Sequence, residues 1–427
     1  MTDLSPIPET SRAASVQEVR TPGGLTAWLV EDYTVPMVAA QFAFHGGASQ
    51  DPVERPGIVT LLGGMLDEGA GPYDSAGFHE AMDDLAVHLH FSVDRDHLAG
   101  HFQTLTRNLD PAFELLRLAV CEARLDQAPI DRVVAQLTAS LKRELKDPDA
   151  VVSRSFRAAA FPDHPYGRAA RGEIDTLPQI SRDDLVAMRT KMLARDNLVI
   201  AVVGAIDAKT LAAKLDATFA ALPAHADLIA VPRALMSGVG QRLVADIDVP
   251  QTSIRFGRPG IDRSDPDFMA AVVVNHILGG GAFTARLFRE VREKRGLAYS
   301  VYSQLQNYDR AALLIGATST KNERAAESLA VIEAEIADLL ARGPTEEELA
   351  KARKFLIGSY ALGFDTSTKI AGNLMQLQLE KRPAAYLDQR NRLVAAVTLE
   401  DARRAAGKIL GDGKLLVTLA GRPTGMS

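Results

Sequence analysis

An internal repeat spans nearly the whole chain of 427 residues. The block at 29–52 recurs at 243–266, an offset of 214, with its Leu-Val, Val-Pro, Phe, Gly and Asp-Pro residues in the same order. The block at 180–204 recurs at 397–421, an offset of 217. Runs of matches at a fixed offset indicate a tandem duplication. The chain therefore holds two copies of one large unit, rather than the roughly three domains that its length alone favours.

The join between the copies is rich in residues that break regular structure. Proline and glycine recur there, at Pro223, Pro232, Gly238 and Gly240. This composition is typical of a linker. We therefore divide the chain into a first repeat at 15–223, a linker at 224–240 and a second repeat at 241–427.

Both copies mix strand patterns with helix patterns. Apolar or alternating runs predict strands at 26–30, 37–44, 87–93, 198–204 and 415–421. Apolar residues three or four apart predict helices at 211–222 and 329–339. Capping boxes are predicted where Ser or Thr precedes an acidic residue by three positions, at Ser181 with Asp184, Thr345 with Glu348 and Thr398 with Asp401. We expect the α+β class, each copy being an α/β unit with a largely antiparallel sheet covered by helices.

The composition excludes several kinds of partner and site. Lysine and arginine number 48 against 54 aspartates and glutamates, a net charge of −6, so no basic surface is available for nucleic acid. Apolar residues make up 47%, enough for an ordinary core. The single cysteine, Cys121, excludes an intrachain disulfide framework and a cysteine metal cluster.

Targeting and membrane patterns are not found in the sequence. No segment reaches the ~18 consecutive apolar residues of a membrane span. The first residues, Met1 to Ser15, show neither a basic n-region nor an apolar h-region. We therefore expect a cytoplasmic protein by default, or a periplasmic one if a signal peptide was removed.

Four histidines of the first copy have spacings that a metal site could use. His88 and His90 would share one face of a strand, and His97 and His101 would share one face of a helix. No carboxylate or third histidine stands at a matching spacing. Because exposed histidines are common in proteins, we favour a half-exposed hairpin and predict no metal site here.

The most informative stretch of the second copy is 277–303. Gly279-Gly280-Gly281 is expected to lead into a helix, and Gly296 to allow a left-handed turn out of it. Tyr299 and Tyr302 lie three residues apart in the strand that follows, so we expect them on opposite faces. Inside the helix, the apolar side comprises Leu287, Phe288 and Val291, and the cations of the C-terminal end are Arg292, Lys294 and Arg295. These patterns alone describe a capped helix, a tight turn and a strand.

The segment FREVREKRGLAYSVYS, with the three glycines before it, closely resembles the second-domain signature of the pitrilysin/insulinase-like zinc peptidases, specifically the processing-peptidase branch. The resemblance extends over nearly the whole chain, including its two-copy organisation. It implies that an Arg and a Tyr seven residues apart act on the substrate, here Arg292 and Tyr299. It also allows Gly279–Gly281 to bring backbone close to a bound peptide.

The zinc motif of that family, His-x-x-Glu-His, is missing from this chain. Its frame is present at 57–66, but Thr60, Gly63 and Gly64 stand at the three chemical positions. The glutamate ligand expected downstream would fall near 139–141, where no residue can bind zinc, and Glu144 stands alone about one turn beyond. Three-ligand catalytic zinc sites need donors that Thr and Gly do not supply. We therefore expect no metal in this chain and no peptidase activity from it alone.

Taken together, the resemblance implies one half of a heterodimeric zinc metallopeptidase. A homologous partner bearing His-x-x-Glu-His would hold the zinc and the general base, and the substrate would be a peptide. Tyr299 would donate a hydrogen bond to the developing oxyanion, and Arg292 would hold backbone carbonyls. Two alternatives stay open: a non-catalytic structural subunit like the core subunits of respiratory complexes, and a homodimeric peptide-binding protein.

Overall fold

The structure is a computed structural model of the chain, and it describes residues 15–425. Residues 1–14, which hold most of the segment where we found no export signal, lie outside this range. Within 15–425, we find no helix that combines the length and the apolar content needed to cross a membrane.

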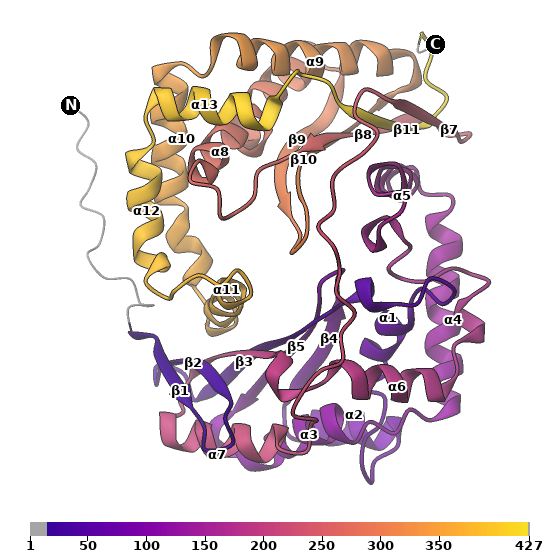
Figure 1. Cartoon of the computed structure of the whole chain (residues 1–427), viewed down its shortest axis with the longest axis vertical. Coiled ribbons are helices and arrows are strands. Elements are labelled where there is room, and N and C mark those ends of the chain that lie inside the picture. The colour runs from indigo at the N-terminus through magenta and orange to yellow at the C-terminus, as the bar shows by residue number, and fades with distance from the viewer. Residues whose placement is uncertain (1–14, 426–427) are drawn as a thin grey trace. The chain divides into compact units, whose positions relative to one another are not determined.

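Two compact units make up the chain, and each takes a segment from the other sequence copy. Of the described residues, unit 1 comprises 15–139, 169–230 and 361–389, and unit 2 comprises 140–168, 231–360 and 390–425. Helix α11 (Ser367–Leu379) therefore belongs to unit 1, where it packs on strands β3 and β6, and Figure 1 shows this late segment against the early sheet. Helix α5 (Pro148–Ala160) belongs to unit 2 and packs on strands β8 and β11. The units thus differ from the sequence copies by these exchanged helices.

Unit 1 is built on a six-stranded mixed sheet with the order β1-β2-β6-β3-β5-β4. All neighbouring strands are antiparallel except β2 and β6. Its strands are β1 (Gln17–Arg20), β2 (Thr26–Glu31), β3 (Met37–His45), β4 (His88–Val93), β5 (His97–Leu105) and β6 (Leu198–Gly204). Its other helices are α1 (Ile58–Gly63), α2 (Ser75–Asp84), α3 (Leu109–Cys121), α6 (Arg182–Met192) and α7 (Ala208–Phe219), and α4 (Gln127–Glu144) runs across its boundary with unit 2.

Unit 2 repeats this plan with a five-stranded sheet in the order β7-β11-β8-β10-β9, in which only β7 and β11 are parallel. This order matches β2-β6-β3-β5-β4 of unit 1, so the duplication seen in the sequence is present in the strand order. The strands are β7 (Arg242–Asp246), β8 (Gln251–Pro259), β9 (Ala298–Asn307), β10 (Ala312–Lys321) and β11 (Leu416–Gly421). The helices are α8 (Phe268–Asn275), α9 (Ala325–Arg342), α10 (Glu346–Gly358) and α13 (Leu399–Leu410), and α12 (Tyr386–Ala396) runs across the boundary.

The predicted fold class and local elements are confirmed. Helices cover two mixed, largely antiparallel sheets, as the α+β class requires. All three capping boxes are formed, each with the hydroxyl accepting from the backbone of the acidic residue and the carboxylate accepting in return. A cap of this kind contributes about 1 kcal/mol to its helix.

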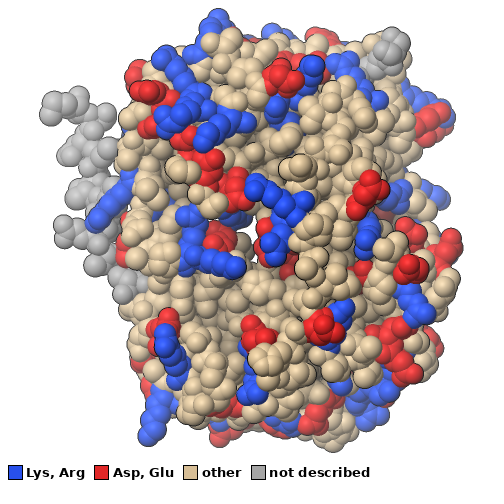
Figure 2. Space-filling view, viewed as in Figure 1, with Lys and Arg blue, Asp and Glu red and all other residues tan. Residues whose placement is uncertain are grey.

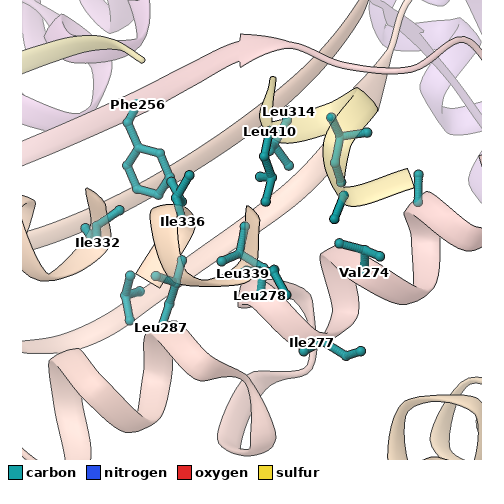
Figure 3. Packing of buried hydrophobic residues seen from close by; sticks show 14 of the residues in the cluster. Phe256, Val274, Ile277, Leu278, Leu287, Leu314, Ile332, Ile336, Leu339 and Leu410 are labelled. Carbon is teal, nitrogen blue, oxygen red and sulfur yellow. The ribbon is translucent and has the colours of Figure 1, made fainter. Parts of the chain in front are cut away.

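The core of unit 2 anchors the stretch 277–303. Ile277, Leu278 and Leu287, on either side of the glycines, belong to one buried cluster with Ile336 and Leu339 of helix α9, in which Leu278 lies beside Leu339 (Figure 3). All five side chains are at most 5% exposed. Burying side chains of this kind contributes about 1.5–3 kcal/mol each, so the segment that carries Arg292 is held firmly.

Candidate functional site

The three glycines end one helix rather than open the next, which corrects the sequence-based expectation. Helix α8 continues into a π-helical turn, His276–Gly280, and a short 3-10 turn follows at Ala282–Thr284. Gly279 lies against β9, where a Cβ atom would stand 2.5 Å from both the backbone nitrogen and Oγ of Ser303. Absence of a side chain is what allows this helix end to close on the strand. The structure thus gives Gly279 a packing role, and substrate binding by the glycines stays a prediction.

The turn out of the next helix follows the sequence-based prediction. This helix is π-helical over Phe288–Glu293, and Gly296 adopts a φ of 58°, in the left-handed region. The Gly296 N–H donates to the Arg292 carbonyl at 2.9 Å, and the Leu297 N–H donates to the Val291 carbonyl at 2.9 Å. These two bonds satisfy carbonyls at the end of the helix and direct the chain into β9.

Tyr299 and Tyr302 are both exposed, so the expectation of opposite faces was wrong. Val301 pairs with Thr318, but Ala298 pairs with Thr320, so β9 has one residue more than β10 between these pairs. The extra residue forms a β-bulge, which breaks the strict alternation of a strand. Ala298 and Val301 therefore both join the core, while Tyr299 is 82% exposed and Tyr302 is 41% exposed.

Arg292 and Tyr299, the pair singled out by the sequence, are in contact. The guanidinium carbon of Arg292 lies 4.4 Å from the centre of the Tyr299 ring and 4.7 Å from the centre of the Phe288 ring. Arg292 is half-buried. Across the described residues, its guanidinium makes no hydrogen bond or ion pair, and the Tyr299 hydroxyl has no hydrogen-bond partner either. Two aromatic contacts thus hold Arg292 while its N–H donors stay available.

Other cations around Arg292 are mostly neutralised. Lys294 and Arg295 both pair with Glu290 at 2.6 Å. Arg286 is buried and binds Glu348 through two 2.7 Å hydrogen bonds, which ties the helix to the capping box of α10. Arg289 is exposed, and within the described part of the chain it has neither an ion pair nor a ring contact.

Phe283 is a site residue that the sequence reasoning missed. It follows Ala282, whose φ of 46° is unusual for a residue with a side chain, and it is 69% exposed. Its ring meets the Phe288 ring edge-on, with 5.0 Å between centroids. Phe283 is therefore linked through Phe288 to Arg292, and Arg292 in turn contacts Tyr299. A large aromatic residue among glycines and alanines was the available signal.

The residues at the lost zinc motif do not fit a zinc ion. Thr60 uses its hydroxyl to donate to the Ala170 carbonyl at 2.7 Å. Gly63 is buried at the end of α1, and a Cβ atom there would stand 2.7 Å from Cγ2 of Val93. Gly64 follows as the C-cap residue of the same helix. None of the three offers a nitrogen or carboxylate donor, and the space for a side chain at Gly63 is already filled.

The histidines form a β4–β5 hairpin, as expected. His90 and His101 are directly opposite each other and their rings stack, with 4.4 Å between centroids. The nitrogens of His101 are engaged by Gln41 and by Ser92, and burial together with the His90 charge lowers its pKa. His97 lies four residues before His101 on a strand rather than a helix, about 13 Å away, which is too far to share a metal ion.

Asp67, just after the lost motif, is a half-buried carboxyl group whose ionisation opposes folding. Burial, with a smaller contribution from the Glu68 charge, raises its pKa to about 6. The unfolded chain therefore loses this proton at lower pH than the folded chain, and stability falls as the pH rises through that interval. We expect Asp67→Asn to raise the free energy of unfolding by up to ~3 kcal/mol above pH 7, and by almost nothing at pH 4. Urea unfolding at the two pH values measures the difference.

The control for this prediction is Asp83→Asn in helix α2. Asp83 is exposed, and its side chain has no partner within the described residues. This substitution should change stability equally little at both pH values. An Asp67→Asn effect of the same size at pH 4 and pH 8 would contradict the proposed role of ionisation.

Surface charge is mixed in sign. On the face shown in Figure 2, Lys and Arg side chains are interspersed with Asp and Glu rather than gathered in one stripe. Many of them are paired on the surface, as Arg117 is with Glu114 and Glu122. This distribution agrees with the net charge of −6.

Comparisons with known proteins agree with this organisation. The model described as Insulinase (Peptidase family M16) matches residues 27–173, and the model described as Peptidase M16 inactive domain matches residues 179–356. A Helicobacter pylori protein named non-peptidase homolog YmxG is 27% identical over 338 residues, which cover 79% of this chain and 78% of that protein. Mitochondrial-processing peptidase subunit beta of Blastocladiella emersonii is 23% identical over 411 residues, which cover 95% and 88%. Other relatives carry the name uncharacterized zinc protease.

A solved structure shares the whole fold. The crystal structure described as peptidase M16 inactive domain from Pseudomonas fluorescens matches with a TM-score of 0.90 and 28% identity. The match covers 96% of this chain and 98% of that one. The similarity therefore includes both units and not a single shared domain.

Proposed function

The chain belongs to peptidase family M16, the insulinase-like peptidases, and from this premise we propose that it is the zinc-free subunit of a two-chain endopeptidase of the processing-peptidase branch. It is an inactive-type member of the family, since Thr60, Gly63 and Gly64 replace the metal-binding residues. A homologous partner bearing His-x-x-Glu-His would supply the missing half.

The observation that carries this proposal is the state of Arg292 and Tyr299. In unit 1, the zinc-motif positions hold residues that cannot bind a metal. In unit 2, an exposed tyrosine, Tyr299, contacts Arg292, which has no ion pair among the described residues. A purely structural subunit has no need to hold a half-buried cation without a counter-charge, because such a group is costly. Donors held available in this way favour a substrate-binding role over the structural alternative.

These two residues have complementary tasks in the proposed complex. When bound in the partner, zinc would activate the water nucleophile. Tyr299, from this chain, would donate a hydrogen bond from its hydroxyl to the carbonyl oxygen, which gains negative charge when the peptide carbonyl is attacked. Arg292 would donate N–H groups to oxygen atoms of the bound peptide, and the Phe288 and Tyr299 rings would fix its orientation.

Reconstitution with a candidate partner tests the proposal. We expect the purified chain to cleave no peptide, and a mixture with a homologous chain bearing His-x-x-Glu-His to cleave a fluorogenic peptide and to elute as a complex in size-exclusion chromatography. Replacing the motif glutamate of the partner by glutamine should abolish cleavage, since the general base is lost. Peptide cleavage by this chain alone, or failure of every such partner to form a complex, would overturn the proposal.

A further inference from the structure

The environment of Arg292 selects among the oxygen ligands that a peptide can offer. Its guanidinium lies 4.7 Å from one aromatic ring centre and 4.4 Å from another, Phe288 being buried and Tyr299 exposed. The rings contact the guanidinium, and its N–H groups, which have no hydrogen-bond partner among the described residues, are left to meet a ligand. An arginine edge is a fork that matches two oxygen atoms held in one plane.

The charge balance around this fork favours an anion. Glu290, the buried acidic residue of the same helix, is already shared by Lys294 and Arg295 at 2.6 Å each. Glu348 and Asp338 are engaged by Arg286. These acidic groups are therefore already paired, and Arg292 itself has no ion pair among the described residues.

A carboxylate satisfies both conditions, two oxygens in one plane and a negative charge, whereas a backbone carbonyl satisfies neither. A carbonyl offers a single oxygen and no charge, so it leaves a half-buried cation uncompensated. A carboxylate places two oxygens on the fork and neutralises the guanidinium, and such charge-assisted bidentate bonds are about twice as strong as neutral ones.

We propose that the edge of Arg292 is a carboxylate-binding subsite, which selects peptides that present an Asp or Glu side chain or a free C-terminal carboxylate beside Tyr299. This inference rests on the proposed function for its peptide substrate, and it goes further by naming the chemical group that is recognised. The Tyr299 hydroxyl stays free for the reacting carbonyl.

Arginine side-chain NMR of the full chain tests the proposal without any partner subunit. The Nε–H signal of Arg292 is identified by its loss in Arg292→Lys. Three blocked hexapeptides serve as probes: one with a central Glu, one with Gln in its place, and the Gln peptide with a free C-terminal carboxylate instead of an amide. We expect at least one acid-bearing probe to shift the Arg292 signal, with an apparent affinity about tenfold higher than that of the neutral peptide.

The acid-bearing probes distinguish the two carboxylate sources, since saturation by the Glu peptide indicates a side chain and saturation by the free-acid peptide indicates a C-terminus.

Arg289→Gln is the matched control, because Arg289 has the same charge on the same helix but no ring contact, and it should change affinity less than twofold. Equal affinity for the neutral and acidic peptides overturns the carboxylate subsite and leaves the proposed function standing. Absence of a shift with all three probes also overturns the subsite, while turnover of the reconstituted complex decides the proposed function separately.

Discussion

Replacing Tyr299 by Phe should lower the turnover number of the reconstituted complex by ~10²–10³-fold, the usual effect of losing one oxyanion donor. The substitution removes only the hydroxyl, whose oxygen has no partner within the described chain, and keeps the ring that contacts Arg292. Because the donor acts on charge that develops in the transition state, kcat should fall while KM changes little. Steady-state kinetics with a fluorogenic peptide measures both constants.

Tyr302→Phe is the matched control for this experiment. Tyr302 lies on the same strand and is also exposed, but it makes no ring contact with Arg292. Its turnover should stay within about twofold of the natural complex. If Tyr299→Phe leaves kcat unchanged as well, Tyr299 is not an oxyanion donor and the structural-subunit alternative gains ground.

Much of the fold could be predicted because it depends on local rules. The capping boxes at Ser181, Thr345 and Thr398 need only a hydroxyl and an acid three residues apart, and all three are formed. The left-handed turn at Gly296 needs only a glycine after a helix. The repeat predicted two similar units, and the matching strand orders confirm it.

The features that the sequence did not predict depend on contacts between distant residues. The bulge beside Tyr299 is set by the pairing of β9 with β10, and the apolar pattern of one strand does not contain it. The π-helical turn at His276–Gly280 depends on how closely Gly279 approaches Ser303. The exchange of helices α5 and α11 between the units could not be predicted from the constant spacing between the two sequence copies. That spacing does not say which sheet a helix covers.

In the candidate site, too, some features could be predicted from the sequence and others required the structure. The family resemblance was enough to single out Arg292 with Tyr299, and the residue types were enough to exclude zinc ligands at Thr60, Gly63 and Gly64. The contact of the Arg292 guanidinium with two rings, and the aromatic neighbour Phe283, emerged only from the structure. The sequence thus indicated the residue pair to examine and the absence of zinc ligands, whereas the proposed ligand preference is argued from the surroundings of Arg292.

Helix α1, at the position of the lost zinc motif, packs closely on strand β4, and this leads to a second large effect. A Cβ atom on Gly63 would stand 2.7 Å from Cγ2 of Val93, the end of a short and stiff side chain. Gly63→Ala should therefore cost about 1–3 kcal/mol through overpacking, despite the ~1 kcal/mol that alanine gains over glycine in a helix. Gly63→Glu, which restores the acidic residue of the motif, should cost more, because it also buries a carboxylate. Urea unfolding of the whole chain, followed by hydrogen exchange in β4, measures both.

The neighbouring glycine makes this prediction specific. Gly64 has a φ of −73°, and the nearest atom to a Cβ there would be 3.5 Å away, an ordinary contact. Gly64→Ala should thus be neutral or stabilising by up to about 1 kcal/mol, although it lies one residue away in the same helix end. Equal stability of Gly63→Ala and Gly64→Ala would show that β4 can move aside and that a motif helix still fits. A destabilisation confined to position 63 would show that strand β4 has closed over the place of the lost glutamate, so that restoring the three motif residues alone cannot rebuild a metal site.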